Sequence, residues 1–97
     1  MDIIILKKNN NGGDVVKPRR QPYGTKNISG AIIELLRKEN NMKQSELVSQ
    51  MQVLGVDINP SSLSKLEGQR RIATDYELRA IAHILKVPMD RLVPPIE

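Results

Sequence analysis

The sequence predicts an all-α fold, a compact bundle of about five short helices that follows a flexible basic N-terminal arm. From residue 28 onward, apolar residues recur at helical spacing in runs that end at Gly, Asn or Pro, and no credible strand appears there. Apolar residues make up 39% of the 97 positions and are nearly all aliphatic. Such a core suits packed helices better than sheets, because strands favour aromatic and β-branched residues.

Residues 1–27 form the expected arm, and residues 28–97 form the expected domain. Residues 7–27 are rich in Asn, Gly, Pro and charged side chains, a composition typical of disorder. The arm holds six basic and two acidic side chains, whereas the domain holds nine of each, so the whole net charge of +4 lies in the arm. This asymmetry suits a protein that meets polyanions, although a solvated tail without a partner would have the same composition.

Capping and breaking residues delimit the first three expected helices. Ser29 is the expected N-cap of the first helix, and the second helix begins near Lys43 and ends at Gly55. The third helix has Asn59 as its cap and Pro60 at its first position, where the missing N–H of proline costs nothing.

A fourth helix is expected to open at Asp75, as a capping residue near the positive helix terminus, and to stop at Pro88. A short fifth helical turn follows before the prolines at 94 and 95. The side chains expected to point inward are Ile32, Ile33, Leu35, Leu36, Leu47, Val48, Met51, Val56, Ile58, Leu63, Leu66, Leu78, Ile81, Ala82 and Leu85.

The third expected helix has an outer face made of small polar residues. At about 100° per residue, Leu63 and Leu66 point toward the core. Four residues fall on the opposite side, namely Ser61, Ser64, Lys65 and Gly68. Such a face fits the major groove of DNA, where Ser and Lys can contact base edges or phosphates, but an ordinary solvated helix face would also have this pattern.

Three segments occur together in an order that is known from one family. They are "LRKENNMKQSELV", "INPSSLSKLEGQRR" and "YELRAIAHILKV", and they span about half of the chain, residues 36–87. This region resembles the phage Cro/repressor-type helix-turn-helix DNA-binding family, the lambda-repressor-like or xenobiotic-response-element class. The resemblance implies a lambda-repressor-like fold that binds double-stranded DNA, commonly as a dimer on a two-fold-related operator. The second helix of the motif would lie in the major groove.

The resemblance also implies roles for particular residues. The base-facing positions would be Pro60, Ser61, Ser64 and Lys65, and the phosphate-contacting positions would be Lys43, Gln44, Gln69, Arg70 and Arg71. Arg37 and Glu67 would form a structural ion pair between the first and third helices. The chain departs from the family in two ways. Many relatives have Gln where this chain has Pro60, and the 16 positions between Gln44 and Pro60 exceed the spacing in compact members.

Two further contact regions are expected. Basic side chains of the arm could follow the DNA backbone or enter a minor groove, and these are Lys17, Arg19, Arg20 and Lys26. The C-terminal segment carries more apolar surface than its length can hide, so some of its residues would cap the core and the rest would form a homodimer seam. Its apolar residues are Met89, Leu92, Val93 and Ile96.

Catalytic and metal-binding patterns are missing from the sequence. It contains no cysteine, no Gly-rich phosphate loop, no hydrolase elbow and no zinc pattern, so we expect no enzyme activity, no cofactor and no metal. A lone histidine such as His83 is an ordinary helix-face residue far more often than a ligand. No apolar run approaches the ~20 residues of a membrane span, and the lack of cysteine fits a cytoplasmic protein.

These patterns together favour a sequence-specific DNA-binding transcriptional regulator, a repressor that binds a two-fold-symmetric operator as a dimer. Two alternatives stay open at this point. One is a DNA-binding antitoxin that also binds a toxin chain. The other is a protein-interaction adaptor that has kept the fold without DNA binding, and the proline at position 60 is the feature that favours it.

Overall fold

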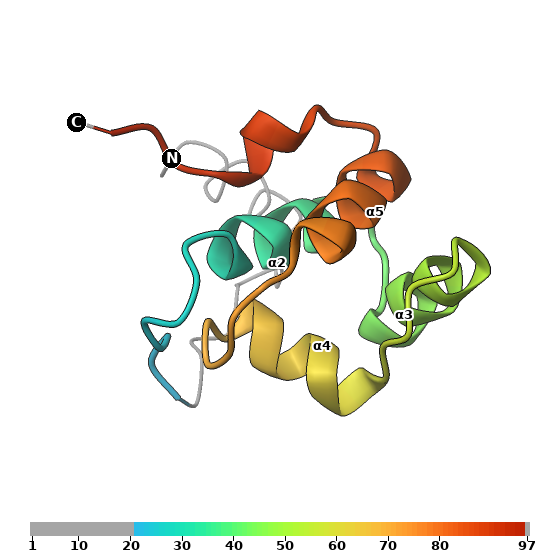
Figure 1. Cartoon of the computed structure of the whole chain (residues 1–97), viewed down its shortest axis with the longest axis horizontal. Coiled ribbons are helices and arrows are strands. Elements are labelled where there is room, and N and C mark those ends of the chain that lie inside the picture. Colours follow the sequence, from blue (N-terminus) through green and yellow to red (C-terminus); the bar gives the residue numbers. More distant parts are fainter. Residues whose placement is uncertain (1–20, 97) are drawn as a thin grey trace, which may run out of the picture.

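Four α-helices and one 3₁₀ turn make up the part of the computed structural model that can be described, residues 21–96 (Figure 1). The elements are α2 (Gly30–Glu39), α3 (Gln44–Val53), α4 (Pro60–Glu67), α5 (Asp75–Leu85) and η2 (Met89–Leu92). No strand occurs in residues 21–96, so the predicted all-helical class is confirmed for them. The fifth helix that we expected is a single 3₁₀ turn of four residues.

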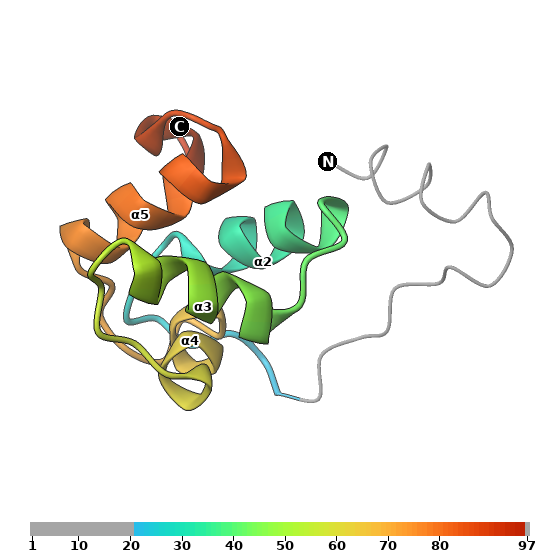
Figure 2. The same cartoon turned by 90° about the vertical axis from the view of Figure 1, so that its right-hand side faces the viewer.

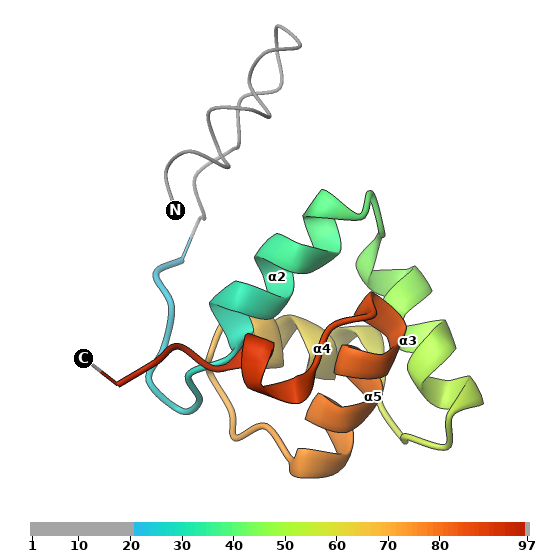
Figure 3. The same cartoon turned by 90° about the horizontal axis from the view of Figure 1, so that it is seen from above.

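A single aliphatic core joins all five elements. Its buried apolar residues are Ile33, Leu36, Leu47, Val48, Met51, Ile58, Leu63, Leu66, Ala80, Ile81, Ala82, Leu85 and Leu92. Most of the side chains predicted to point inward are among them, while Ile32, Val56 and Leu78 are partly buried against the same cluster. Figures 1 and 2 show α4 at one end of the molecule and α5 with η2 at the other. Seen from above, α2 and α3 lie on two sides of α5 (Figure 3).

The N-terminus of α2 is capped from outside the helix. Ser29 occupies the predicted N-cap position, but its side chain makes no capping hydrogen bond. Asn27 does so instead, since its Oδ1 accepts hydrogen bonds from the backbone N–H groups of Ser29 (3.0 Å) and Gly30 (2.8 Å). Gln69 Oε1 accepts a third, from Ala31 N at 3.1 Å. Three of the free N–H groups at this helix end are therefore satisfied by a preceding residue and by the turn after α4.

The other helix starts are local. Asn59 caps α4, with Pro60 at the first position, as predicted, and its Oδ1 accepts a hydrogen bond from Ser62 N at 2.8 Å. The prediction that Asp75 caps α5 is wrong, because Thr74 holds that position. Thr74 Oγ1 accepts a hydrogen bond from Glu77 N (3.1 Å), and Glu77 Oε1 accepts one from Thr74 N (3.0 Å). This reciprocal pair satisfies two N–H groups at once.

The ion pair predicted between Arg37 and Glu67 is present and buried. Arg37 Nε lies 2.7 Å from Glu67 Oε2, and Arg37 Nη2 lies 2.9 Å from Oε1. Only 8% of the arginine side chain and 1% of the glutamate side chain are exposed. A third guanidinium N–H donates to the carbonyl of Met42 at 2.8 Å. The pair therefore ties α2 to the inner side of α4.

Residues 21–27, which we expected to belong to the flexible arm, lie against the helical domain. Their backbone and side chains form hydrogen bonds with the last residues of α4 and with the turn after it. We call this segment the strap. Composition alone suggested disorder here, but Asn27, Gly24 and Lys26 each have a specific partner in the turn.

Candidate nucleic-acid interface

The outer face of α4 consists of four exposed residues, Pro60, Ser61, Ser64 and Lys65. These are the residues that the sequence placed there. We call them the α4 face. The side chains of Ser61, Ser64 and Lys65 have no hydrogen-bond or ion-pair partner within residues 21–96. Gly68, which the helical wheel placed on the same side, is buried instead: it is the C-cap of α4, and its carbonyl accepts a hydrogen bond from Gly24 N at 2.7 Å.

The single acidic residue of α4 does not reach its outer face. Glu67 points inward, where Arg37 neutralises it. Lys65 is therefore the one charged side chain on the α4 face. Because the other members are small or uncharged, this face carries a positive charge and allows a close approach by another molecule.

The first residue of α3 is attached to the same buried pair. Gln44 Nε2 donates a hydrogen bond to Glu67 Oε1 at 2.8 Å. One N–H of this amide is thus committed inside the molecule, and the second N–H remains for an external acceptor. The neighbouring Lys43 is exposed, and its backbone N donates to Glu46 Oε1 at 2.6 Å. The start of α3 is fixed relative to α4 through one carboxylate.

The long connection between α3 and α4 is a turn. It covers residues 54–59, between Val53 and Pro60. Gly55 adopts a φ of 88°, a conformation that L side chains rarely adopt. Ile58 is buried, and its carbonyl accepts a hydrogen bond from Gln52 Nε2 at 2.8 Å. The extra residues therefore form an anchored loop without lengthening α4.

The turn after α4, residues 68–71, uses its side chains inside the molecule. Gln69 has a φ of 59° and Arg70 N donates to the carbonyl of Lys65 at 2.9 Å, which is the Schellman ending of a helix. The Gln69 amide bonds Ala31 N through Oε1 and the Gly24 carbonyl through Nε2, at 3.1 and 3.3 Å. Both the oxygen and the nitrogen of the Gln69 amide thus have a partner within the fold, and one N–H of Nε2 remains for the phosphate contact that we expected.

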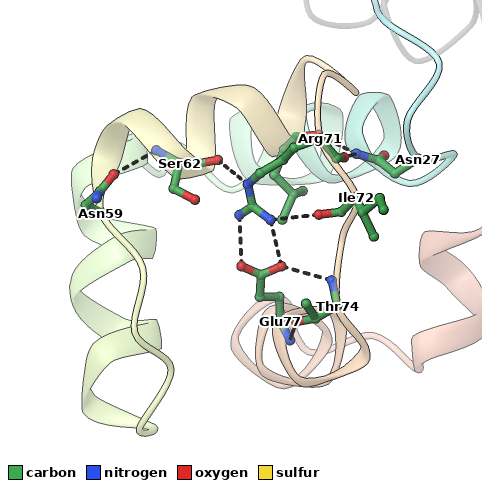
Figure 4. Close-up of polar contacts among 8 residues, drawn as sticks. Asn27, Asn59, Ser62, Arg71, Ile72, Thr74 and Glu77 are labelled. Carbon is green, nitrogen blue, oxygen red and sulfur yellow. Dashed lines mark hydrogen bonds and ion pairs between the residues drawn. The ribbon is translucent and has the colours of Figure 1, made fainter.

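Arg71 is likewise engaged within the fold (Figure 4). Its guanidinium lies 2.8 and 3.0 Å from the two carboxylate oxygens of Glu77, and its Nε donates to the carbonyl of Ser62 at 3.0 Å. Only 23% of its side chain is exposed. We had expected Arg71 to contact phosphates, but in the structure it joins α4 to α5. A sequence cannot distinguish the two arginines of a pair by partner, and here only Arg70 stays exposed.

The charge of Arg71 affects the titration of Glu77. Burial by itself would raise the pKa of the Glu77 carboxyl group. Hydrogen bonds from Arg71 and from the Thr74 backbone N–H, together with the positive charge of Arg71, outweigh burial, so the pKa of Glu77 lies below its ordinary value. The carboxylate therefore stays ionised to a lower pH than an ordinary glutamate does.

The structure locates only some residues of the two further contact regions that we expected, the basic arm and the dimer seam. Lys17, Arg19 and Arg20 lie outside the described residues, while Lys26 is exposed on the strap. In the expected dimer seam, Leu92 is fully buried and belongs to the core, so it is not available for a partner. The remaining seam residues are exposed to 41% (Met89), 39% (Val93) and 101% (Ile96).

Asn27 is a site residue that the sequence reasoning missed. Its Nδ2 donates to the carbonyls of Leu66 (3.0 Å) and Arg71 (2.8 Å), while its Oδ1 caps α2. One side chain thus joins the strap, α2 and the turn after α4. Its position two residues before the expected cap was the available signal, because Asn is among the strongest helix-capping residues.

Other site types find no support in the described part of the chain. Residues 21–96 contain no group of three or more His, Cys, Asp or Glu side chains that could hold a metal ion. No helix among them is long and apolar enough to cross a membrane.

The comparisons with known proteins give no match: no family model fits the chain, and no curated protein and no solved structure is significantly similar to it. The likeness to the Cro/repressor-type family therefore rests on the three sequence segments alone.

Proposed function

We propose that this protein is a cytoplasmic, sequence-specific double-stranded DNA-binding regulator of transcription, a repressor that binds a two-fold-symmetric operator as a dimer. In this proposal α3 and α4 form a helix-turn-helix of the lambda-repressor-like type. The α4 face enters the major groove, and the start of α3 lies on the phosphate backbone. Neither a cofactor nor an enzymatic step is part of the proposal.

The observation that carries the proposal is the α4 face itself. Ser61, Ser64 and Lys65 are exposed and have no partner within residues 21–96, and the acid of the same helix is buried. Short hydroxyl side chains let a helix backbone approach base edges, and they can donate or accept hydrogen bonds there. Pro60 offers only apolar contact, which suits a thymine methyl group. A solvated surface helix would more often carry long charged side chains of both signs.

Phosphate contacts in this proposal come from residues beside α4. Gln44 keeps one amide N–H free, and Lys43 and Arg70 are exposed. The free N–H groups at the start of α3 favour an anion at the same place. Gln69 keeps one amide N–H as well, whereas Arg71 supports the α4 face from inside and contacts no phosphate.

The test is selection of bound duplexes from a random pool by the full chain. We expect a two-fold-symmetric consensus with half-sites about 10 base pairs, or a multiple of that, apart. Recovery of a random pool with no enriched sequence would contradict sequence-specific binding. A consensus without symmetry would contradict the dimer while leaving DNA binding in place.

A second candidate function is binding of a partner protein, as in the antitoxin or adaptor alternatives. The observation that favours it is an open hollow of about 300 Å³ between α3 and α5, which Val53, Leu54 and Ile84 help to line. Val53 is 85% exposed. A second chain that co-purifies with the protein but not with Val53→Asp would support this candidate. Failure to shift any duplex at low salt would then favour the adaptor, and a shifted duplex would favour the antitoxin.

A further inference from the structure

The strap lies along the turn after α4, and backbone hydrogen bonds join the two segments. Gly24 N donates to the carbonyl of Gly68 at 2.7 Å, and Lys26 N donates to the carbonyl of Gln69 at 2.9 Å. Both carbonyls follow directly after the last residue of α4. The backbone of Lys26 is therefore fixed relative to that end of the helix.

Gly24 allows this close approach because it has no side chain. A Cβ atom at this position would overlap the carbonyl oxygen of Gln69 and lie 3.2 Å from the Cα atom of Arg70. The backbone of a turn cannot move aside as the end of a flexible side chain can. We therefore expect even an alanine at this position to displace the strap, and Lys26 with it.

Side chains hold the strap on both sides of Lys26. On one side, Asn27 Nδ2 donates to the carbonyls of Leu66 and Arg71, and the second of these bonds is drawn in Figure 4. On the other side, the carbonyl of Pro22 accepts a hydrogen bond from Arg70 Nη2 at 2.8 Å. The position of Lys26 on the turn is thus fixed by contacts before it and after it.

Two exposed cations lie side by side at this junction, one from the strap and one from the turn. The side chain of Lys26 is exposed and has no hydrogen-bond or ion-pair partner within residues 21–96. Arg70 is also exposed, and it follows Gln69, whose carbonyl holds the Lys26 backbone. A guanidinium carries five N–H donors, and the bond to Pro22 uses one of those of Arg70. Both cations are therefore able to bind an external anion.

No acidic side chain neutralises these cations from within the junction. Residues 21–27 and 68–71 contain no Asp or Glu, and Glu67 is buried. Glu34 on α2 contacts the strap, but Lys38 lies 3.4 Å from its carboxylate. The junction therefore attracts anions.

The length of α4 determines which part of a DNA duplex the junction would meet. An α-helix of eight residues is about 12 Å long, close to the ~12 Å width of the major groove. When the α4 face lies over base edges, the residues just after α4 therefore reach the sugar-phosphate strand that borders the groove. Lys26 and Arg70 lie at that point.

We propose that Lys26 and Arg70 together bind the DNA phosphates that border the major groove beyond the end of α4, with Gly24 as the positioning residue that holds Lys26 in this site. This inference rests on the proposed function. It makes Lys26 part of a site that is already formed in the folded domain, and not a cation of a flexible arm. It also explains why the strap is attached to the turn so closely.

The experiment measures how the affinity of the full chain for the selected duplex depends on salt concentration. Each phosphate contact adds about 0.9 to the slope of log K against log salt, so Lys26→Gln should reduce the slope by about 0.9 for each bound chain. Lys26→Arg keeps the charge and should keep the slope. Lys86→Gln is the matched control, because it removes an exposed lysine at the C-cap of α5 and should leave the slope unchanged. An unchanged slope for Lys26→Gln, or equal losses from the two Gln variants, would overturn the proposed site.

The positioning role of Gly24 is tested by combining substitutions. Gly24→Ala should reduce the slope by about 0.9 for each bound chain, and adding Lys26→Gln should reduce it no further. Additive losses, or a slope that Gly24→Ala leaves unchanged, would overturn the positioning role.

Hydrogen exchange of the unaltered protein decides the positioning role if Gly24→Ala does not fold. The amides of Gly24 and Lys26 should exchange more slowly than the amide of Thr25, which donates to no group within residues 21–96. Equal exchange at all three would overturn docking of the strap. Absence of duplex binding by the unaltered protein would instead overturn the proposed function, and this inference with it.

Discussion

The α4 face and the turn that follows it carry similar residue types but use them differently. On the α4 face, Ser61, Ser64 and Lys65 have no partner within residues 21–96. In the turn, Gln69 forms hydrogen bonds with α2 and the strap, and Arg71 forms them with α5. The difference teaches that a polar residue near a helix end is available to a partner only if the fold does not already need it. Arg70 is the exposed member of the turn.

The largest effect is expected on the inner side of α4. Arg37→Ala should lower the free energy of unfolding by about 3–5 kcal/mol, because it leaves Glu67 buried and unpaired. Chemical denaturation measures this loss. Lys38→Ala removes the neighbouring cation, whose side chain is 51% exposed and pairs only across one helical turn. That control should change stability by less than about 0.5 kcal/mol. Equal effects of the two substitutions would contradict the structural role of Arg37.

The two arginines of the turn give a sharper test of the comparison. Arg71→Ala should destabilise the fold by about 1–3 kcal/mol, since it removes hydrogen bonds to the mostly buried Glu77. Arg70→Ala should barely change stability, because its side chain is exposed and its hydrogen bond to the Pro22 carbonyl (2.8 Å) is open to solvent, but it should weaken DNA binding and reduce the salt slope by about 0.9. Thermal unfolding and duplex binding are measured on both variants. If Arg70→Ala destabilised the fold and Arg71→Ala weakened only DNA binding, the roles assigned to the two arginines would be wrong.

Substitutions on the α4 face should weaken DNA binding and leave stability unchanged, whereas substitutions on the inner side of α4 should lower stability. Lys65→Ala should weaken binding to the selected duplex by about tenfold, or ~1.4 kcal/mol, with no measurable change in stability. Arg91→Ala, which removes an exposed cation from η2 at the far end of the molecule, should leave binding unchanged. If both variants lose affinity equally, general charge and not the α4 face is responsible.

The smallest expected effect is on the stability of the fold at acidic pH, and it comes from Glu77. The pKa of Glu77 is lower in the folded protein than its ordinary value, so the unfolded state binds more protons over the range between the two values. The stability that this carboxylate contributes is present above its unfolded pKa of about 4.3 and is lost as the pH falls through the folded value. Denaturation at several pH values should show a shallower acid loss for Glu77→Gln than for the unaltered protein. If stability depended on pH in the same way in the two proteins, the contribution assigned to the lowered pKa of Glu77 would be contradicted.

Much of the helical layout could be predicted from the sequence because its signals are local. Apolar spacing located α2, α4 and α5, and the Asn59–Pro60 pair marked the start of α4. The capping of α5 was missed by one residue, because Thr74 and Asp75 are both good capping residues and only the reciprocal bond with Glu77 distinguishes them.

Long-range contacts account for what the sequence could not predict. The strap resembles a disordered tail in composition, yet Asn27 and Gly24 reach partners about 40 residues away or more, such as Leu66 (|i−j| = 39) and Gly68. Similarly, nothing in "QRR" indicates that Arg71 turns toward Glu77 while Arg70 stays exposed. Pairings of this kind depend on how the helices pack, and the spacing of residues along the sequence does not show which distant residues will meet.

The most direct test of the central role of the α4 face is an NMR titration of the isotopically labelled full chain with the selected duplex. The account predicts that the backbone amide signals of Ser61, Ser64, Lys65 and Gln44 shift most, and that those of α5 stay in place or shift little. The largest shifts on α5, with the α4 signals unchanged, would contradict the account.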